Sequence, residues 1–151
     1  MKNWQDSEII QNFLLDVLPM FEAACDQMKN QFEGIRACVR EDRVRSDSFM
    51  VYIGVCFPRL ALEECIGVEL VVDFWKRGRL VTFSASVVLD DEKGTIVEGF
   101  EGGRDVPLGD LSLEALKLRL PVLIEALVKC AGDLYSYGVS STSCGNGNGV
   151  R

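Results

Sequence analysis

The absence of histidine limits the chemistry that this chain of 151 residues can perform. Without an imidazole, Ser-His-Asp and Cys-His nucleophile systems, His-ligated zinc sites and imidazole proton shuttles are all excluded. Catalysis would have to depend on carboxylates, amines, phenols, guanidinium groups or thiols. The sequence therefore favours a non-enzymatic function, although it leaves a histidine-free enzyme open.

Glu69 and Asp73 are the residues best suited to acid–base chemistry. They lie four positions apart in a segment with β propensity, so both side chains would project from one face of a strand, opposite Ser86 and Thr82 on the next. A desolvated carboxylate there could act as a general acid or base. A solvated sheet face with cross-strand hydrogen bonds explains the same residues more simply, and we predict no catalytic residue.

The six cysteines lack the spacing of a metal site. Cys38, Cys56 and Cys65 would converge if their strands were neighbours, and with Cys25 or Cys130 they could bind a soft metal. Structural zinc sites usually take their ligands in close pairs from tight turns, whereas these three cysteines are separated by 18 and 9 residues. We interpret the cysteines as buried thiols of a reducing compartment and predict neither a metal nor a cofactor.

Two further segments have the composition of anion-binding or nucleic-acid-binding sites. Residues 99–105 are rich in glycine but lack the G-x-x-x-x-G-K-[ST] spacing and an immediately following helix, so we interpret them as a connection. Residues 76–79 are basic and follow Trp75, and four arginines could extend this patch: Arg36, Arg40, Arg43 and Arg45. The net charge of −7 opposes binding to a phosphate backbone, and we expect no nucleic-acid partner.

The elements that position these residues are clearest in segment 66–89, where two apolar runs flank the basic stretch 76–79 and predict a β-hairpin. We expect Trp75 to pair with Leu80, and Val72 with Phe83. One face of this hairpin is then wholly apolar: Ile66, Val68, Leu70, Val72 and Phe74 with Val81, Phe83, Ala85, Val87 and Leu89. The other face is mixed: Gly67, Glu69, Val71, Asp73 and Trp75 with Leu80, Thr82, Ser84, Ser86 and Val88.

Segments 35–44 and 48–57 predict a second hairpin, with residues 43–47 as its turn. Its second strand is apolar on both faces, since Phe49, Val51, Ile53, Val55 and Phe57 alternate with Met50, Tyr52, Gly54 and Cys56. An antiparallel strand with one face in water normally alternates with polar residues, so this strand is either covered on both sides or meets another chain. A fifth strand, 95–100, would place Ile96 and Phe100 on the apolar face if Leu89 pairs with Ile96.

Long amphipathic helices are predicted at both ends of the chain. The first carries Ile10, Phe13, Leu14, Val17, Leu18, Phe21, Cys25, Met28 and Phe32 on one face, and the last carries Leu116, Leu120, Leu123, Ile124, Leu127, Ala131, Leu134 and Tyr135. Pro19 and Pro121 fall inside these patterns, so we expect a kink or a break at each. Gly138 is the expected end of the second helix, and the Ser-, Gly- and Asn-rich residues 139–151 are predicted to form a flexible tail.

The sequence therefore predicts a single α+β domain, residues 1–138, in the order α-β-β-β-β-β-α. One antiparallel sheet of about five strands, two hairpins plus one strand, would carry both helices on one face. Hydrophobic and charged contents of 48% and 26% are typical of globular proteins. The start of the chain lacks the apolar core of a signal peptide and no segment has the length of a membrane span, so we expect a cytoplasmic protein with no membrane partner.

We interpret this chain as a non-enzymatic protein–protein interaction module, of the kind of chaperones, adaptors or immunity proteins, that could act as a homodimer. The candidate interaction surface lies on the second face of the sheet: Met50, Tyr52, Cys56, Glu69, Val71, Asp73, Trp75 and Leu80. The alternative is a small-molecule binder or enzyme with a pocket between sheet and helices, lined by the polar residues Tyr52, Glu69, Asp73, Ser84 and Ser86.

Overall fold

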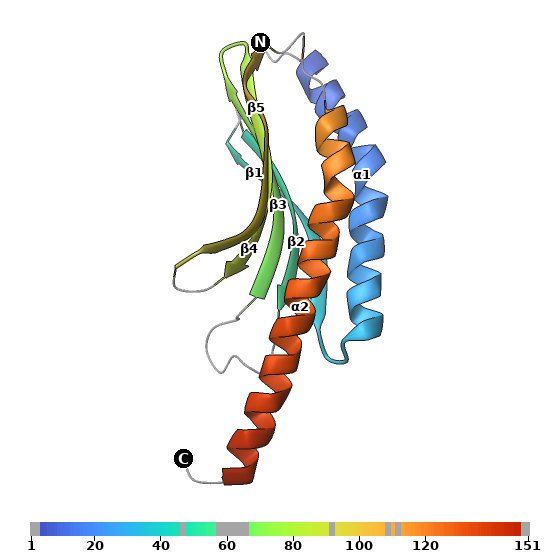
Figure 1. Ribbon diagram of the computed structural model, residues 1–151. Coiled ribbons are helices and arrows are strands. Elements are labelled where there is room, and N and C mark those ends of the chain that lie inside the picture. The colour runs from blue at the N-terminus through green and yellow to red at the C-terminus, as the bar shows by residue number, and fades with distance from the viewer. Residues whose placement is uncertain are drawn as a thin grey trace.

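The computed structural model describes residues 4–45, 48–56, 67–90, 93–107, 110 and 113–148 and confirms the predicted order of elements (Figure 1). Helix α1 (Trp4–Gln31) is followed by strands β1 (Arg36–Arg45), β2 (Ser48–Cys56), β3 (Gly67–Arg77), β4 (Leu80–Asp90) and β5 (Thr95–Pro107), and then by helix α2 (Glu114–Asn148). Phe57, Cys65 and Ile66 lie outside the described residues.

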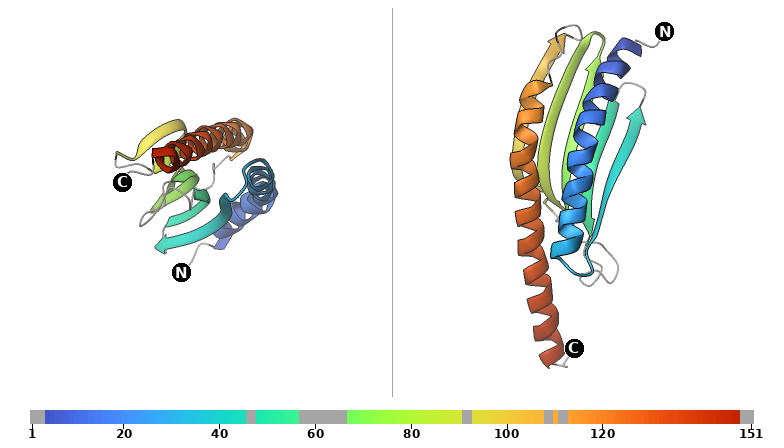
Figure 2. Two further views of the ribbon diagram at one scale, coloured as in Figure 1. Left: turned by 90° about the horizontal axis from the view of Figure 1, so that it is seen from below. Right: turned by 90° about the vertical axis from the view of Figure 1, so that its right-hand side faces the viewer.

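The five strands form one antiparallel sheet in the order β1-β2-β3-β4-β5, so each strand pairs with its neighbours in sequence. Both helices pack on the same face of this sheet, as predicted: α1 contacts β1, and α2 contacts β3, β4 and β5 (Figures 1 and 2). No helix of the described ranges lies on the opposite face. The fold therefore has two layers, one of helices and one of strands.

The hairpin of β3 and β4 confirms the predicted sorting of side chains, because burial alternates along both strands. The predicted register is wrong by two residues, since Trp75 pairs with Thr82 and Phe74 with Phe83. The turn holds only Gly78 and Arg79, and Gly78 has φ 59°, a value that suits glycine in a tight hairpin turn. A shift of two residues leaves every side chain on its predicted face, which is why the hydrophobic pattern alone could not fix the partners.

Strand β5 differs more from the prediction, because it continues to Pro107 instead of ending near Phe100. Leu89 pairs with Thr95 and not with Ile96, and the register shifts between Val87 and Val88. Phe100 packs against the core as expected, but Ile96 is 66% exposed, so its predicted place on the apolar face is wrong. An irregularity in a β ladder adds an unpaired residue to one strand, and alternation beyond that point cannot be predicted from a strict period of two.

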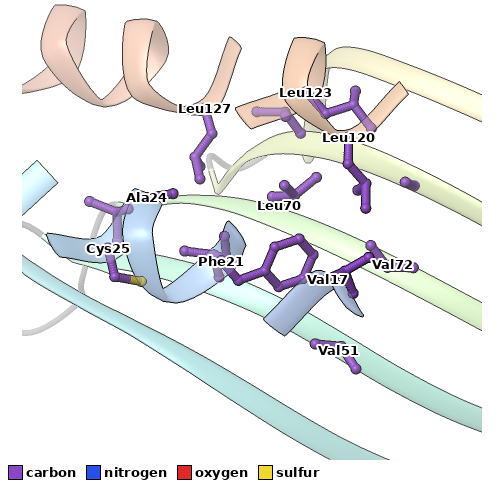
Figure 3. Packing of buried hydrophobic residues seen from close by; sticks show 14 of the residues in the cluster. Val17, Phe21, Ala24, Cys25, Val51, Leu70, Val72, Leu120, Leu123 and Leu127 are labelled. Atoms are coloured by element: carbon purple, nitrogen blue, oxygen red, sulfur yellow. The ribbon is translucent and has the colours of Figure 1, made fainter. Parts of the chain in front are cut away.

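The hydrophobic core fills the space between the layers (Figure 3). Its most deeply buried large side chains come from both helices and the central strands: Val17, Phe21, Met28, Val51, Ile53, Val68, Leu70, Val72, Leu116, Leu120, Leu123 and Leu127. The rings of Phe13 on α1 and Phe74 on β3 meet edge to face with centroids 5.6 Å apart. No polar or charged side chain in the described part of the chain is buried, so apolar contacts hold the layers together.

Each helix is continuous through its proline, so the predicted division into shorter helices is wrong (Figure 2). Proline has no N–H, and Pro19 and Pro121 therefore leave the carbonyl groups of Leu15 and Lys117 without their usual partners. Both prolines and Leu15 are exposed and Lys117 is half-buried, so these carbonyl groups lie on the sides of the helices that water reaches. The helices continue because the unpaired groups face solvent and not the core.

Helix α2 also passes the expected end at Gly138 and continues to Asn148, beyond the sheet and α1 (Figure 1). The expectation that Gly138 ends the helix is therefore wrong. Glycine and serine lower helix propensity by about 1 kcal/mol or less per residue but do not block the backbone hydrogen bonds as proline does. Flexibility of residues 139–151 stays a prediction.

Candidate functional site

The helix-free face of the sheet, called the outer face below, is built from every second residue of the strands. On β1 to β4 its described residues include Arg36, Cys38 and Arg40 on β1, Met50, Tyr52 and Gly54 on β2, Glu69, Val71, Asp73, Trp75 and Arg77 on β3, and Leu80, Thr82, Ser84, Ser86 and Val88 on β4. On β5 the partners of Val88, Ser86 and Ser84 are Ile96, Gly99 and Glu101. The alternate residues point into the core. The outer face is thus positioned by the same alternation that buries the inner one.

All but one of the side chains predicted to form an interaction surface are described, and these lie together on the outer face. Trp75 is 50% exposed and Leu80 is 38% exposed. Five others are half-buried: Met50, Tyr52, Glu69, Val71 and Asp73. Cys56 is placed by its backbone alone, between Arg36 and Gly67, and its side chain lies outside the described part of the chain. Binding by this surface stays a prediction.

The strand register divides the outer face into strips of different character. Strand β1 contributes a mainly basic strip, with Arg36 and Arg40 exposed, and Asp42, placed by its backbone alone, belongs to the same face. Strand β2 contributes Met50, Tyr52 and Gly54, which carry no charge. Strand β3 contributes two carboxylates on either side of an apolar residue: Glu69, Val71 and Asp73. Because Arg40, Tyr52 and Val71 are direct cross-strand partners, the three strips are aligned row by row.

Arg40 connects the basic strip to the uncharged one. Its Cζ atom lies 5.0 Å from the centroid of the Tyr52 ring, a cation–π contact. Its positive charge also acts to lower the pKa of the Glu69 carboxyl, against larger effects that raise it. The sequence pointed to Arg40 only as part of a basic segment. The register of β1 against β2, which the predicted hairpin left open, is what places it beside Tyr52.

Both carboxyls on β3 are partly withdrawn from water. Burial raises the pKa of Glu69 above its ordinary value, and the negative charge of Asp90 adds to this. Burial also raises the pKa of Asp73. The protein therefore holds two carboxyl groups among apolar neighbours, where burial disfavours their charged forms. Positive charges on a partner would stabilise the charged forms.

These carboxylates are poorly placed for acid–base catalysis. The predicted cross-strand partners are wrong by two residues, since Glu69 faces Val88 and Asp73 faces Ser84. Four residues along a strand correspond to about 13 Å, which is more than the carboxylate separation of about 5–9.5 Å in paired-carboxylate hydrolases. The two groups therefore cannot act together on one bond as such a pair does.

The alternative hypothesis required polar groups inside a pocket between the layers. The structure places these groups on the opposite side of the sheet, because Tyr52, Glu69, Asp73, Ser84 and Ser86 all belong to the outer face. The inner face at these strands is apolar and packed against the helices. No convergence of polar residues between sheet and helices supports the pocket hypothesis in the described part of the chain.

Thiols and basic residues are spread over the molecule. Cys25 is buried on α1, where burial raises its pKa to about 11, whereas Cys38 is exposed on β1. Within the described ranges, no three metal-ligating side chains come together.

At the basic hairpin tip, the Nη2 atom of Arg77 lies 3.7 Å from the Oδ1 atom of Asp105. Neither helix, as far as its residues are described, has the length and hydropathy of a membrane-spanning segment.

Gly54 is an outer-face position that the sequence did not single out. A Cβ atom there would lie 3.8 Å from the Tyr52 ring and 4.0 Å from the Cys38 sulfur, which are ordinary contact distances. The residue therefore leaves a small open space on the face.

Comparisons of the whole chain with models of protein families, with curated proteins and with solved structures find no match.

Proposed function

We propose that this protein is a non-enzymatic protein-binding module and that the outer face is its binding surface. The observation that supports this most strongly is the difference between the two faces of one sheet. Both helices cover one face, and the other carries large apolar side chains with no helix over them: Met50, Tyr52, Val71, Trp75, Leu80 and Val88. A sheet face that is meant only for water is normally polar along each strand.

The composition of the outer face supports a protein partner. Aromatic residues, methionine and arginine are enriched at protein interfaces, and Trp75, Tyr52, Met50 and Arg40 provide these types on neighbouring strands. A nucleic acid is a poorer match, because the chain carries a net charge of −7 and the β3 strip adds two carboxylates to this face.

We propose that the protein acts in the cytoplasm and that its partners include a second copy of the same chain. The described cysteines Cys25, Cys38 and Cys130 are free thiols, the state that a reducing compartment maintains. The strips of the outer face carry both signs of charge, which suits contact with a second copy as well as with another protein.

The proposal can be tested with a charge placed in the centre of the outer face. Val71→Arg would be compared with Glu125→Arg, which introduces the same side chain at an exposed position on α2. The tagged proteins would be expressed in their native cells, cross-linked and analysed by quantitative mass spectrometry. We expect the wild type and Glu125→Arg to retain the same specific partners and Val71→Arg to lose them. Equal recovery by all three proteins would contradict the proposal.

A further inference from the structure

We infer that the outer face binds a second copy of this chain, packed sheet against sheet about a twofold axis that runs along β2. The inference rests on the proposed function and identifies one occupant of its surface. It follows from the order of the strips across the sheet: basic on β1, uncharged on β2 and acidic on β3.

The charges determine the direction of the axis. Two sheets that pack face to face with nearly aligned strands can be related by a twofold axis along the strands or across them. An axis along β2 reverses the strand order, so that β1 of each copy lies over β3 of its partner. An axis across the strands would instead place each strand over its own copy, and at the row of Arg40 it would bring Arg40 towards Arg40 and Glu69 towards Asp73. Only the first arrangement brings opposite charges together.

The rows of the sheet show which residues would meet. Arg40 and Val71 belong to one row, so Arg40 of one copy would lie over Val71 of the other. Glu69 and Asp73 stand one row to either side, about 7 Å along the strand, within reach of a long arginine side chain. Asp42, placed by its backbone alone, shares a row with Asp73 and would lie over it, a like-charge pair that the contacts of Arg40 with both carboxylates have to outweigh. Twofold symmetry repeats this contact, while Tyr52 and Met50 of the two copies would face each other at the axis.

The two carboxylates favour this arrangement energetically. Desolvation of a charged group opposes binding, and Glu69 and Asp73 are already half-buried in the single chain. Bringing an arginine over them adds attraction with less further loss of hydration than for fully exposed carboxylates. The Gly54 position leaves room beside Tyr52 at the axis, where the two sheets approach most closely.

The size of the contact indicates a weak dimer. Three overlapping strands cover about 14 Å by about 30 Å, which corresponds to roughly 900 Å² of buried surface for the two copies together. Stable complexes usually bury about 1,200–2,000 Å², so we expect reversible association with a dissociation constant in the micromolar range. Association should therefore be measured over a range of concentrations.

Sedimentation velocity of the full chain between about 5 and about 200 μM would test the inference, since this range spans the affinity expected for a contact of this size. We expect a concentration-dependent dimer. Arg40→Glu alone, and Glu69→Arg with Asp73→Arg, should each weaken association by about tenfold or more, because like charges then face each other. All three substitutions in one chain reverse the charges of the contact between Arg40 and the two carboxylates, and should return the dissociation constant to within about threefold of the wild type. Lys129→Glu, on the exposed side of α2, controls for a change of charge elsewhere.

A second measurement needs no variant. Raising the sodium chloride concentration from about 50 to about 500 mM shortens the range of electrostatic attraction and should weaken the wild-type dimer. A wild type that stays monomeric up to about 200 μM, or a dimer that none of these charge changes affects, would overturn the inference. If Val71→Arg still lost other partner proteins in the cross-linking experiment, the proposed protein-binding function would stand without the dimer. Failure of the triple exchange to restore the dimer would overturn the arrangement in which β1 of each copy lies over β3 of its partner.

Discussion

The backbone of β2 lies unusually close to Gly67 at the start of β3. A Cβ atom on Gly67 would stand well inside 3.0 Å of the carbonyl oxygen of Val55, a distance that real Cβ atoms essentially never show. Gly67 pairs with Cys56 on one side and Asp90 on the other, so it sits within the ladder that joins β2, β3 and β4. The absence of a side chain at Gly67 therefore permits the register of the central strands.

We expect Gly67→Ala to destabilise the fold by roughly 1–3 kcal/mol, because the backbone of one strand must move to admit the methyl group. Gly54→Ala is the matched control, since its Cβ would make only ordinary contacts and alanine loses less backbone entropy in a strand than glycine. Its effect should be neutral or slightly stabilising. Urea unfolding at equilibrium measures both changes, and equal losses of stability would contradict the close approach at Gly67.

Adjacent residues on β3 test the assignment of the two faces. Phe74 is 2% exposed and its ring packs against those of Phe13 and Phe83, whereas Trp75 is 50% exposed on the outer face. Phe74→Ala should reduce the free energy of unfolding by about 3–5 kcal/mol. Trp75→Ala should reduce it by less than about 1 kcal/mol, although it removes a larger side chain. A greater loss for Trp75→Ala would show that the two faces have been exchanged.

Most of the fold follows from the hydrophobic pattern, because the inner face of the sheet and one face of each helix have to be apolar. The same pattern could not choose between registers that differ by two residues, so Trp75 was paired with Leu80 and not with Thr82. It also could not locate the irregularities of β5, which leave Ile96 in solvent. These features depend on turn geometry and on contacts between strands. The alternation of apolar and polar residues along one strand carries no information about either.

The sequence predicted which residues lie on the outer face, but not how their charges are arranged across the strands. Alternation placed Glu69, Val71 and Asp73 on one face, and the structure agrees. The relation of Arg40 to Tyr52 needed the register of β1 against β2, which the sequence left open beyond a predicted hairpin. The opposite strips on β1 and β3 therefore became visible only when three strands were aligned.

The sequence predicts a kink or a break at each proline because the rule for proline concerns the hydrogen bond that it removes, and not where the unpaired group lies. Pro19→Ala restores the N–H that can bond to the Leu15 carbonyl and should stabilise the protein by about 1–3 kcal/mol, after allowance for the greater freedom of the unfolded chain. Pro121→Ala on α2 should act in the same direction. Thermal unfolding followed by circular dichroism measures this, and a fall in Tm for both variants would show that the prolines support the helices.

The carboxyls of Glu69 and Asp73 should make stability depend on pH in a defined direction. Burial raises the pKa of both in the folded protein, so the folded state binds protons more tightly than the unfolded state. Their contribution opposes folding when both are ionised at neutral pH, and this opposition is lost as the pH falls through the raised folded pKa values towards the ordinary carboxyl range. Glu69→Gln with Asp73→Asn should remove the effect and stabilise the protein at pH 7, by less than about 1 kcal/mol because water still screens these half-buried groups.

The difference between the wild type and this double variant isolates the two carboxyls from all others. Urea unfolding from pH 7 to the upper end of the ordinary carboxyl range should show the gap in stability closing as the pH falls. Measurements are needed well below the concentration at which the second copy binds, because an arginine from a partner would lower both pKa values and reduce the gap. A gap that widens as the pH falls would mean that Glu69 and Asp73 are stabilised as carboxylates within the single chain, and that the outer face does not hold them partly withdrawn from water.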